Sequence, residues 1–180
     1  MTTQPDTAVT NQKFDDDQWR PIADVDGHYA DWLVRRGLLT PDLRASFADP
    51  VVVDLLKEGT RAAPSWALSL LGAADRDGWY REITLGVGGT VLVHAACFAP
   101  SRTLRQHPWI QELGTQPLGS TLARIPDTTR AEMLFAPGSA LGDSAADGWS
   151  RRSVFDVAGA PLMLVEHLAA ELGGVARKHP

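Results

Sequence analysis

The segment WYREITLGVGGTVLVHAACFA, residues 79–99, consists of two extended runs separated by a pair of glycines. Glycine adopts the left-handed backbone conformation that a two-residue hairpin turn requires, so Gly88-Gly89 predicts a tight turn. Strands joined by such a turn run antiparallel. A phosphate-binding glycine loop would lead into a helix, whereas a second β-branched run follows here. The segment therefore predicts a hairpin within an antiparallel sheet.

Further extended and helical runs continue along the chain. Strand-like runs occupy residues 51–59, 129–138, 151–159 and 160–172, and Ala158-Gly159 between the last two predicts another hairpin turn. Helical spacing predicts a helical hairpin from residues 27–36 and 41–49, with Thr40-Pro41 as an N-cap followed by a first-turn proline. Short helices are predicted over residues 63–72 and 117–124. The predicted fold class is α+β, a single antiparallel β-sheet of about six strands with flanking helices.

Composition narrows the class of protein. The 180 residues are expected to form one domain over residues 19–172, with a flexible leader at 1–18 and a flexible tail at 173–180. A net charge of −5 argues against broad attraction to nucleic acid or anionic lipid. A single cysteine, Cys97, excludes an internal disulfide. With no signal-peptide pattern and no apolar window long enough to span a bilayer, we expect a cytoplasmic protein without membrane insertion.

Two charged residues interrupt strand faces that are otherwise apolar. Arg81 alternates in phase with Trp79, Ile83 and Leu85, and Glu166 alternates in phase with Leu162, Leu164 and Leu168. Burying an isolated charge is costly, so each should meet a partner, a ligand or solvent. A structural ion pair between the two, or a face open to water, would satisfy them. A pocket in which the arginine binds a carboxylate and the glutamate handles a hydroxyl or a proton would do so too.

Other chemistries have little support. The five histidines show none of the spacings typical of zinc ligands, so we expect neither a metal nor another cofactor. Cys97 lies in an apolar run without an activating base, and no GxSxG motif is present. Glu166 and His167 are neighbours on a strand and point to opposite faces, so they cannot act on one ligand.

Five short motifs carry a resemblance to a known family. They are GLLTPDL (37–43), WYREI (79–83), TQPLGSTL (115–122), GWSRRSVF (148–155) and APLMLVEHL (160–168). In this order and spacing the chain resembles the chorismate pyruvate-lyase (chorismate lyase) family over about residues 28–170. The resemblance implies helical flaps over an internal aromatic-acid site. It also implies a cofactor-independent carbon–oxygen lyase that eliminates pyruvate from chorismate to give 4-hydroxybenzoate, the first step toward ubiquinone.

The same resemblance assigns roles to individual residues. Arg81 would bind the ring carboxylate, helped by the backbone N–H groups of Leu39 and Leu118, and Glu166 would meet the ring hydroxyl. Arg81 and Glu166 are thus the expected catalytic residues. Whether Glu166 takes the C4 proton or only orients the 4-hydroxyl stays open, as does a concerted transfer of that hydrogen to the enolpyruvyl methylene.

The chain also departs from the family pattern and leaves room for rival functions. Residues 167–170 replace a common Phe-Leu-Pro, and Leu39 stands where some relatives have methionine. Arg151 and Arg152 match the family's Arg-Arg-Ser and are expected to do no more than steer a dianion.

The implied partners are chorismate and 4-hydroxybenzoate, without nucleic acid or membrane, and we expect a monomer. One rival is a non-catalytic aromatic-acid sensor domain, since the effector domains of some transcription regulators resemble this fold. Fewer than 30 residues precede the first expected helix, too few for the helix-turn-helix domain of such regulators. Another rival is a ligand carrier that merely buries an ion pair. Both rivals predict no turnover.

Overall fold

The computed structural model describes residues 18–21, 24–25, 27–37, 39–68, 70, 76–131, 133–141 and 147–175. The strands are β1 (Val51–Ala62), β2 (Asp77–Val87), β3 (Thr90–Pro100), β4 (Thr128–Arg130), β5 (Leu134–Pro137), β6 (Gly148–Val157) and β7 (Ala160–Ala169). They form one seven-stranded sheet in the order β1-β2-β3-β7-β6-β4, with β5 also paired to β6. All of these pairings are antiparallel. The predicted α+β fold with a single antiparallel sheet is confirmed.

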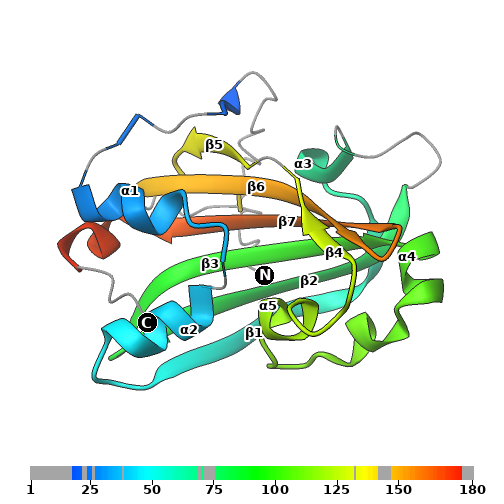
Figure 1. Ribbon diagram of the computed structural model, residues 1–180, viewed down its shortest axis with the longest axis horizontal. Helices are drawn as coiled ribbons and strands as arrows, with labels where there is room; N and C mark the ends of the chain where they lie inside the picture. The colour runs from blue at the N-terminus through cyan, green and yellow to red at the C-terminus, as the bar shows by residue number, and fades with distance from the viewer. Residues whose placement is uncertain are drawn as a thin grey trace, which may run out of the picture.

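Short helices join and cover the strands. They are α1 (Gly27–Leu33), α2 (Leu39–Ser46), α3 (Ser65–Leu68), α4 (Ser101–Gln106), η2 (Pro108–Glu112), α5 (Leu118–Leu122) and η3 (Ala170–Gly174). In Figure 1, α1, α2 and α5 lie in front of one face of the sheet. The predicted helical hairpin is present, but α2 begins at Leu39, so Thr40 lies in its first turn rather than at the N-cap. The predicted leader lies almost wholly outside the described residues, and its flexibility stays a prediction.

Both predicted hairpin turns are confirmed by the backbone. Gly88 and Gly89 have φ values of 57° and 83°, and Ala158 and Gly159 have φ values of 47° and 88°. Two consecutive residues with positive φ form the turn whose twist matches that of the flanking strands. Ala158 adopts this conformation despite its Cβ, which is strained for an L-residue. These turns set the two hairpins β2–β3 and β6–β7 that make the centre of the sheet.

The strand predicted over residues 129–138 is interrupted, which accounts for seven strands instead of about six. Arg130 lies opposite Phe155, whereas Leu134 lies opposite Arg152. Four steps along this edge therefore face three steps along β6, which is the geometry of a bulge. The bulge divides one edge strand into β4 and β5 and changes the direction of the side chains on either side of it.

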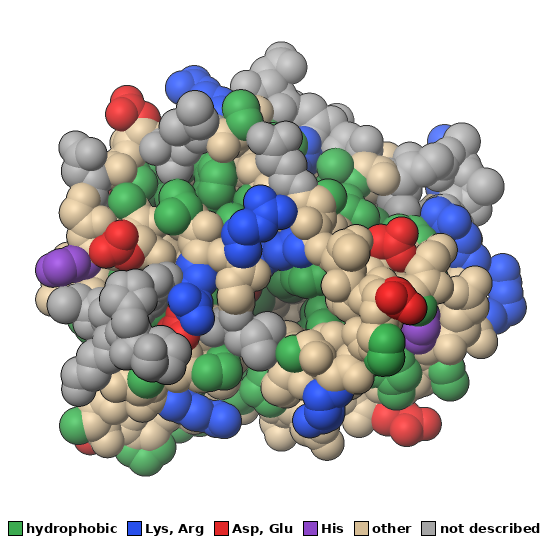
Figure 2. Space-filling model, in the orientation of Figure 1, with side chains coloured by type: hydrophobic (Ala, Val, Ile, Leu, Met, Phe, Trp, Pro, Cys, Tyr) green, Lys and Arg blue, Asp and Glu red, His purple; other side chains and the backbone are tan. Residues whose placement is uncertain are grey.

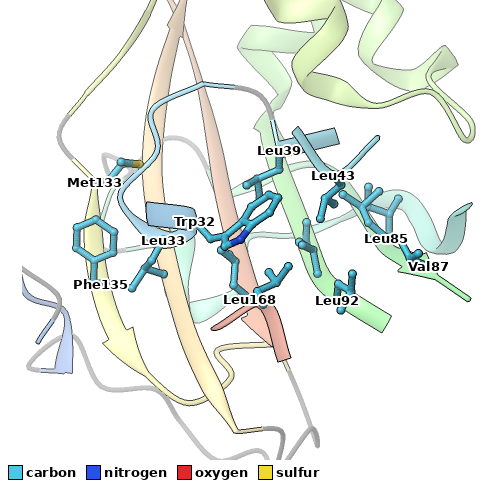
Figure 3. Close-up of a cluster of buried hydrophobic side chains, with 14 residues drawn as sticks. Trp32, Leu33, Leu39, Leu43, Leu85, Val87, Leu92, Met133, Phe135 and Leu168 are labelled. Atoms are coloured by element: carbon cyan, nitrogen blue, oxygen red, sulfur yellow. The ribbon is translucent and has the colours of Figure 1, made fainter. Parts of the chain in front are cut away.

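The register places the two charged residues, Arg81 and Glu166, on one face of the sheet. Arg81 pairs with Cys97, which pairs with Leu164, and the adjacent row joins Ile83, Ala95 and Glu166. Helices α1 and α2 cover the same face and bury side chains against it (Figure 3). The buried cluster there includes Trp32, Leu33, Leu39, Leu43, Leu85 and Leu168. Each large apolar side chain buried in this way contributes about 1.5–3 kcal/mol, so the cluster holds the helical hairpin on the sheet.

The opposite face of the sheet carries a separate polar network. The carboxylate of Glu82 accepts hydrogen bonds from the Tyr80 hydroxyl at 2.5 Å and from His94 Nε2 at 2.9 Å, and Lys57 Nζ lies 3.6 Å away. The His94 hydrogen bond is the main reason why the pKa of Glu82 falls to about 2, in spite of burial, which raises it. This carboxylate is therefore ionised at neutral pH. Among the described residues, no helix has the length and apolar character needed to cross a membrane.

Candidate functional site

A cavity of about 90 Å³ lies between the sheet and two covering segments. We call these segments the flaps: residues 36–37 and 39–41, between α1 and the first turn of α2, and residues 117–122, which include α5. The sheet side of the cavity is apolar and is formed by Ile83, Leu85, Val93, Ala95 and Leu164. Its volume exceeds that of a single water molecule several times over. Basic side chains lie beside a hollow near the middle of this face in Figure 2.

Three of the four predicted site residues line this cavity: Leu39, Leu118 and Glu166. Leu39 is the first residue of α2, and Leu118 is the first residue of α5. The first N–H groups of a helix have no partner inside that helix, so both positions present backbone donors that a ligand oxygen can use. The predicted use of these two backbone N–H groups together with Glu166 stays a prediction.

Glu166 is held by two arginines that the sequence did not assign to it. Its Oε2 accepts a hydrogen bond from Arg151 Nε at 2.8 Å and another from Arg130 Nη2 at 3.0 Å. Burial raises the pKa of Glu166, but the positive charges of Arg151 and Arg130 and the hydrogen bonds from them lower it by more than burial raises it. The pKa of Glu166 therefore lies below its ordinary value. The side chain is thus an anion that faces the cavity. Its two ion pairs replace the Arg81–Glu166 pair that was one of the open alternatives.

Arg151 connects this glutamate to the helical hairpin. The side chain is fully buried, and its Nη1 donates to the carbonyl oxygens of Leu33 at 2.9 Å and Arg35 at 2.8 Å, with Trp32 O at 3.3 Å. Trp32 and Leu33 end α1, where the last turn leaves carbonyl oxygens without helical partners, and Arg35 lies just beyond it. Arg151 therefore ties the start of one flap to Glu166. The sequence contained a signal for this pair, because a turn at residues 158–159 places residue 151 opposite residue 166.

Arg130 reaches the same carboxylate from the edge of the sheet and also lines the cavity. Its Nε donates to Ser153 Oγ at 2.9 Å, and its guanidinium lies 5.0 Å from the centre of the Phe155 ring. Arg130 and Arg36 bond reciprocally across the cavity edge: Arg36 Nη2 donates to Arg130 O at 3.0 Å, and Arg130 Nη1 donates to Arg36 O at 3.3 Å. Sequence reasoning missed Arg130, because its direction depends on the bulge next to it.

Arg81 is buried on the cavity face, 2% exposed, but its guanidinium serves the second flap. Nε and Nη2 donate to Gly114 O at 3.1 and 2.6 Å, and Nη2 also donates to Gln116 O at 2.9 Å. These carbonyls belong to the loop that leads into α5. The residues that line the cavity do not include Arg81. Its expected contact with a carboxylate stays a prediction, and its observed contacts make it an anchor of the loop.

Other groups on this face do not add a reactive centre. Burial raises the pKa of the Cys97 thiol to about 11, which keeps it protonated and a poor nucleophile at neutral pH. Within the residues that the structure describes, no group of three or more His, Cys, Asp or Glu side chains could hold a metal ion. The chemistry of the cavity therefore comes from one buried carboxylate, several guanidinium groups and the backbone donors of the flaps.

Comparison with known proteins identifies the family. The sequence profile of chorismate lyase matches residues 9–172. The chain belongs to the chorismate lyase family. It is 33% identical over 166 residues to a probable chorismate pyruvate-lyase of Halorhodospira halophila, a match that covers 82% of this chain and 87% of that protein. It is 32% identical over 157 residues to the chorismate pyruvate-lyase of Cronobacter sakazakii, covering 85% and 84%. The predicted family is confirmed, and with it the assignment as a lyase.

Solved structures resemble this chorismate lyase-family chain at the level of the fold. The effector domain of PhnF from Mycobacterium smegmatis has a TM-score of 0.54 at 15% identity, covering 77% of this chain and 92% of that chain. The C-terminal domain of the histidine utilization repressor from Pseudomonas syringae has a TM-score of 0.50 at 11% identity, covering 73% and 96%. These likenesses show a shared sheet architecture.

Proposed function

We propose that this chain eliminates pyruvate from chorismate to give 4-hydroxybenzoate, without a cofactor. The observation that carries the proposal is the ionised Glu166 facing a cavity whose sheet side is otherwise apolar and which lies beneath two flaps. A site of this kind suits an aromatic acid, because the ring contacts the apolar floor while a few placed polar groups orient it. Family membership adds that related proteins carry the name chorismate pyruvate-lyase.

The reaction needs little beyond orientation and charge stabilisation. The ether bond between C3 and the enolpyruvyl oxygen breaks, the hydrogen on C4 leaves, and the ring becomes aromatic. Atoms balance as one chorismate giving one 4-hydroxybenzoate and one pyruvate, with neither water nor an oxidant consumed. The protein therefore has to hold the ring in a productive geometry and stabilise the negative charge that moves onto the departing enolpyruvate.

We propose that Glu166 orients the 4-hydroxyl as a hydrogen-bond acceptor. A carboxylate whose pKa is lowered by two guanidinium groups is a weak base, which disfavours removal of the C4 proton by this group. Both arginine bonds go to Oε2, so Oε1 takes neither of them and can accept from the ring hydroxyl. The C4 hydrogen would then pass to the enolpyruvyl methylene in a concerted step in which cleavage of the C3–O bond runs ahead of hydrogen transfer, so that partial negative charge gathers on the ether oxygen before the carbonyl of pyruvate forms.

We propose that Arg81 receives the ring carboxylate together with the N–H groups of Leu39 and Leu118. The bonds from Arg81 to the loop use Nε and Nη2, which leaves the two N–H groups of Nη1 for a carboxylate. A guanidinium that holds both the loop and the ligand would couple ligand binding to the ordering of the second flap.

The product would serve ubiquinone synthesis, and the protein would act as a monomer in the cytoplasm.

The deciding experiment mixes purified protein with chorismate in the presence of EDTA and follows pyruvate and 4-hydroxybenzoate together. Equal amounts of the two products from the wild type, and none from Glu166→Ala, would support the proposal. A folded wild-type sample that binds 4-hydroxybenzoate and forms no product would refute it and favour the sensor or the carrier. Light scattering at several concentrations tests the monomer, and loss of ubiquinone on deletion of the gene tests the pathway.

A further inference from the structure

We propose that Arg130 binds the carboxylate of the enolpyruvyl group and stabilises the negative charge that gathers on the ether oxygen as the C3–O bond breaks. This inference rests on the proposed function. It assigns a substrate contact to a residue of the edge strand that lies outside the sequence motifs. The supporting observations are the place of Arg130 beside Glu166, its exposure to the cavity and the way its guanidinium is held.

The position of Arg130 relative to the substrate follows from the contact proposed for Glu166. If Glu166 accepts the 4-hydroxyl, the group beside Glu166 also lies beside the neighbouring ring carbon, C3, which carries the enolpyruvyl ether. Arg130 Nη2 is 3.0 Å from Glu166 Oε2, and Arg130 lines the same cavity. Its guanidinium is therefore the cation next to the bond that breaks.

The charge balance around Glu166 leaves room for another anion. One carboxylate meets two guanidinium groups, those of Arg130 and Arg151, and this gives one positive charge in excess beside the cavity. Bond cleavage moves an electron pair onto the ether oxygen of the leaving group. In a cavity whose sheet side is largely apolar, a fixed cation stabilises this developing charge more strongly than it would in water.

The other arginines nearby are less suited to the task. Arg151 has no exposed side-chain surface, is not among the residues that line the cavity, and donates from Nη1 to the carbonyls of Leu33 and Arg35. Arg36 is an exposed residue whose Nη2 bonds to backbone carbonyls of the edge strand. The side chain of Arg130 is only 8% exposed and is braced by Ser153 Oγ and the Phe155 ring, so its fork is already oriented before a ligand arrives.

The test compares Arg130→Met, Arg130→Lys and a matched control, Arg61→Met. Arg61 is an exposed residue whose guanidinium stacks on the Tyr80 ring, away from the cavity. For Arg130→Met we expect kcat/KM for chorismate to fall by about a hundredfold to a thousandfold, in line with removal of a preorganised group from a developing charge. The affinity for 4-hydroxybenzoate, which lacks the enolpyruvyl group, should stay within about threefold. Arg61→Met should match the wild type in both.

A binding measurement without turnover makes the test independent of the lyase assay. The probe is 3-(carboxymethoxy)-4-hydroxybenzoate, which adds a carboxylate on the carbon next to the hydroxyl. We expect the wild type to bind it more tightly than 4-hydroxybenzoate by about tenfold to a hundredfold, as for a charge-assisted hydrogen bond. Arg130→Met should lose this advantage, and Arg130→Lys should keep part of it.

Two outcomes would overturn the proposal. Equal loss of 4-hydroxybenzoate binding and of turnover in Arg130→Met would mean that Arg130 only supports Glu166. Unchanged kcat/KM would mean that it does not meet the leaving group. If Arg130→Met fails to fold, Arg130→Lys decides, since a folded lysine variant without any change in kcat or in probe affinity also overturns it. Failure of the proposed function is distinct, because then the wild type itself forms no product.

Discussion

Replacing Glu166 by glutamine tests the electrostatic core of the site. The substitution keeps the shape of the side chain but removes its charge, and it leaves the guanidinium groups of Arg151 and Arg130 facing each other. Arg151 has no exposed side-chain surface, so water cannot compensate it. Breaking a buried ion pair by removing one partner costs about 3–5 kcal/mol, and we expect Glu166→Gln to lose that much stability. For a chain of this size the melting temperature should fall by roughly 6–20 °C.

The assay is urea unfolding at pH 7 followed by tryptophan fluorescence, with Glu112→Gln as a matched control. Glu112 is exposed, so its replacement should change the stability by less than about 0.5 kcal/mol. The double variant Glu166→Gln/Arg151→Met should be more stable than the sum of the single variants predicts, by about 1–3 kcal/mol, because it removes an uncompensated charge. Additive effects, or a Glu166→Gln protein as stable as the wild type, would refute the reasoning.

The stability difference between wild type and Glu166→Gln should change with pH in a defined direction. The folded-state pKa of Glu166 lies below its ordinary value, so its contribution is complete above the unfolded-state pKa of about 4.3 and is lost as the pH falls through the folded-state pKa. The stability difference between wild type and Glu166→Gln should therefore be largest near neutral pH and shrink below about pH 4. A difference that grows on acidification would contradict the assignment of Glu166 as an anion.

Three further predictions follow from particular contacts. Arg81→Ala should abolish 4-hydroxybenzoate binding in calorimetry, and unchanged binding would count against a role of Arg81 at the carboxylate. The same variant should lower the free energy of unfolding by about 1–3 kcal/mol, because it leaves two loop carbonyls without their hydrogen-bond donor. Glu82→Gln should lower the free energy of unfolding by about 3 kcal/mol at pH 7, and this loss should disappear as the pH falls from about 5 toward 2. Because Glu82 lies on the face opposite the cavity, kcat should not change, and a large loss of kcat would show that the two faces are coupled. Ala158→Gly should stabilise the protein by about 0.5–1 kcal/mol in thermal unfolding, because φ is 47° there, and destabilisation would argue against the turn geometry.

Local patterns predicted the parts of the fold that depend on neighbours in the chain. Gly88-Gly89 and Ala158-Gly159 marked both hairpins, because a two-residue turn requires positive φ whatever packs on it. Alternation placed Arg81 and Glu166 on inward faces, since side chains on a strand alternate regardless of the partner. The division of residues 129–138 into two strands was not predicted, because the bulge arises from pairing with β6.

By itself the sequence determined the class of fold, its hairpins and the presence of a cationic and an anionic side chain on otherwise apolar strand faces. Only the tertiary structure decided which groups those charges meet. Glu166 meets Arg151 and Arg130, while Arg81 holds the loop before α5. The physical reason is the separation along the chain of the residues that interact. Turns and alternation arise between near neighbours, whereas an ion pair depends on strand order, on a bulge at the sheet edge and on where each flap packs.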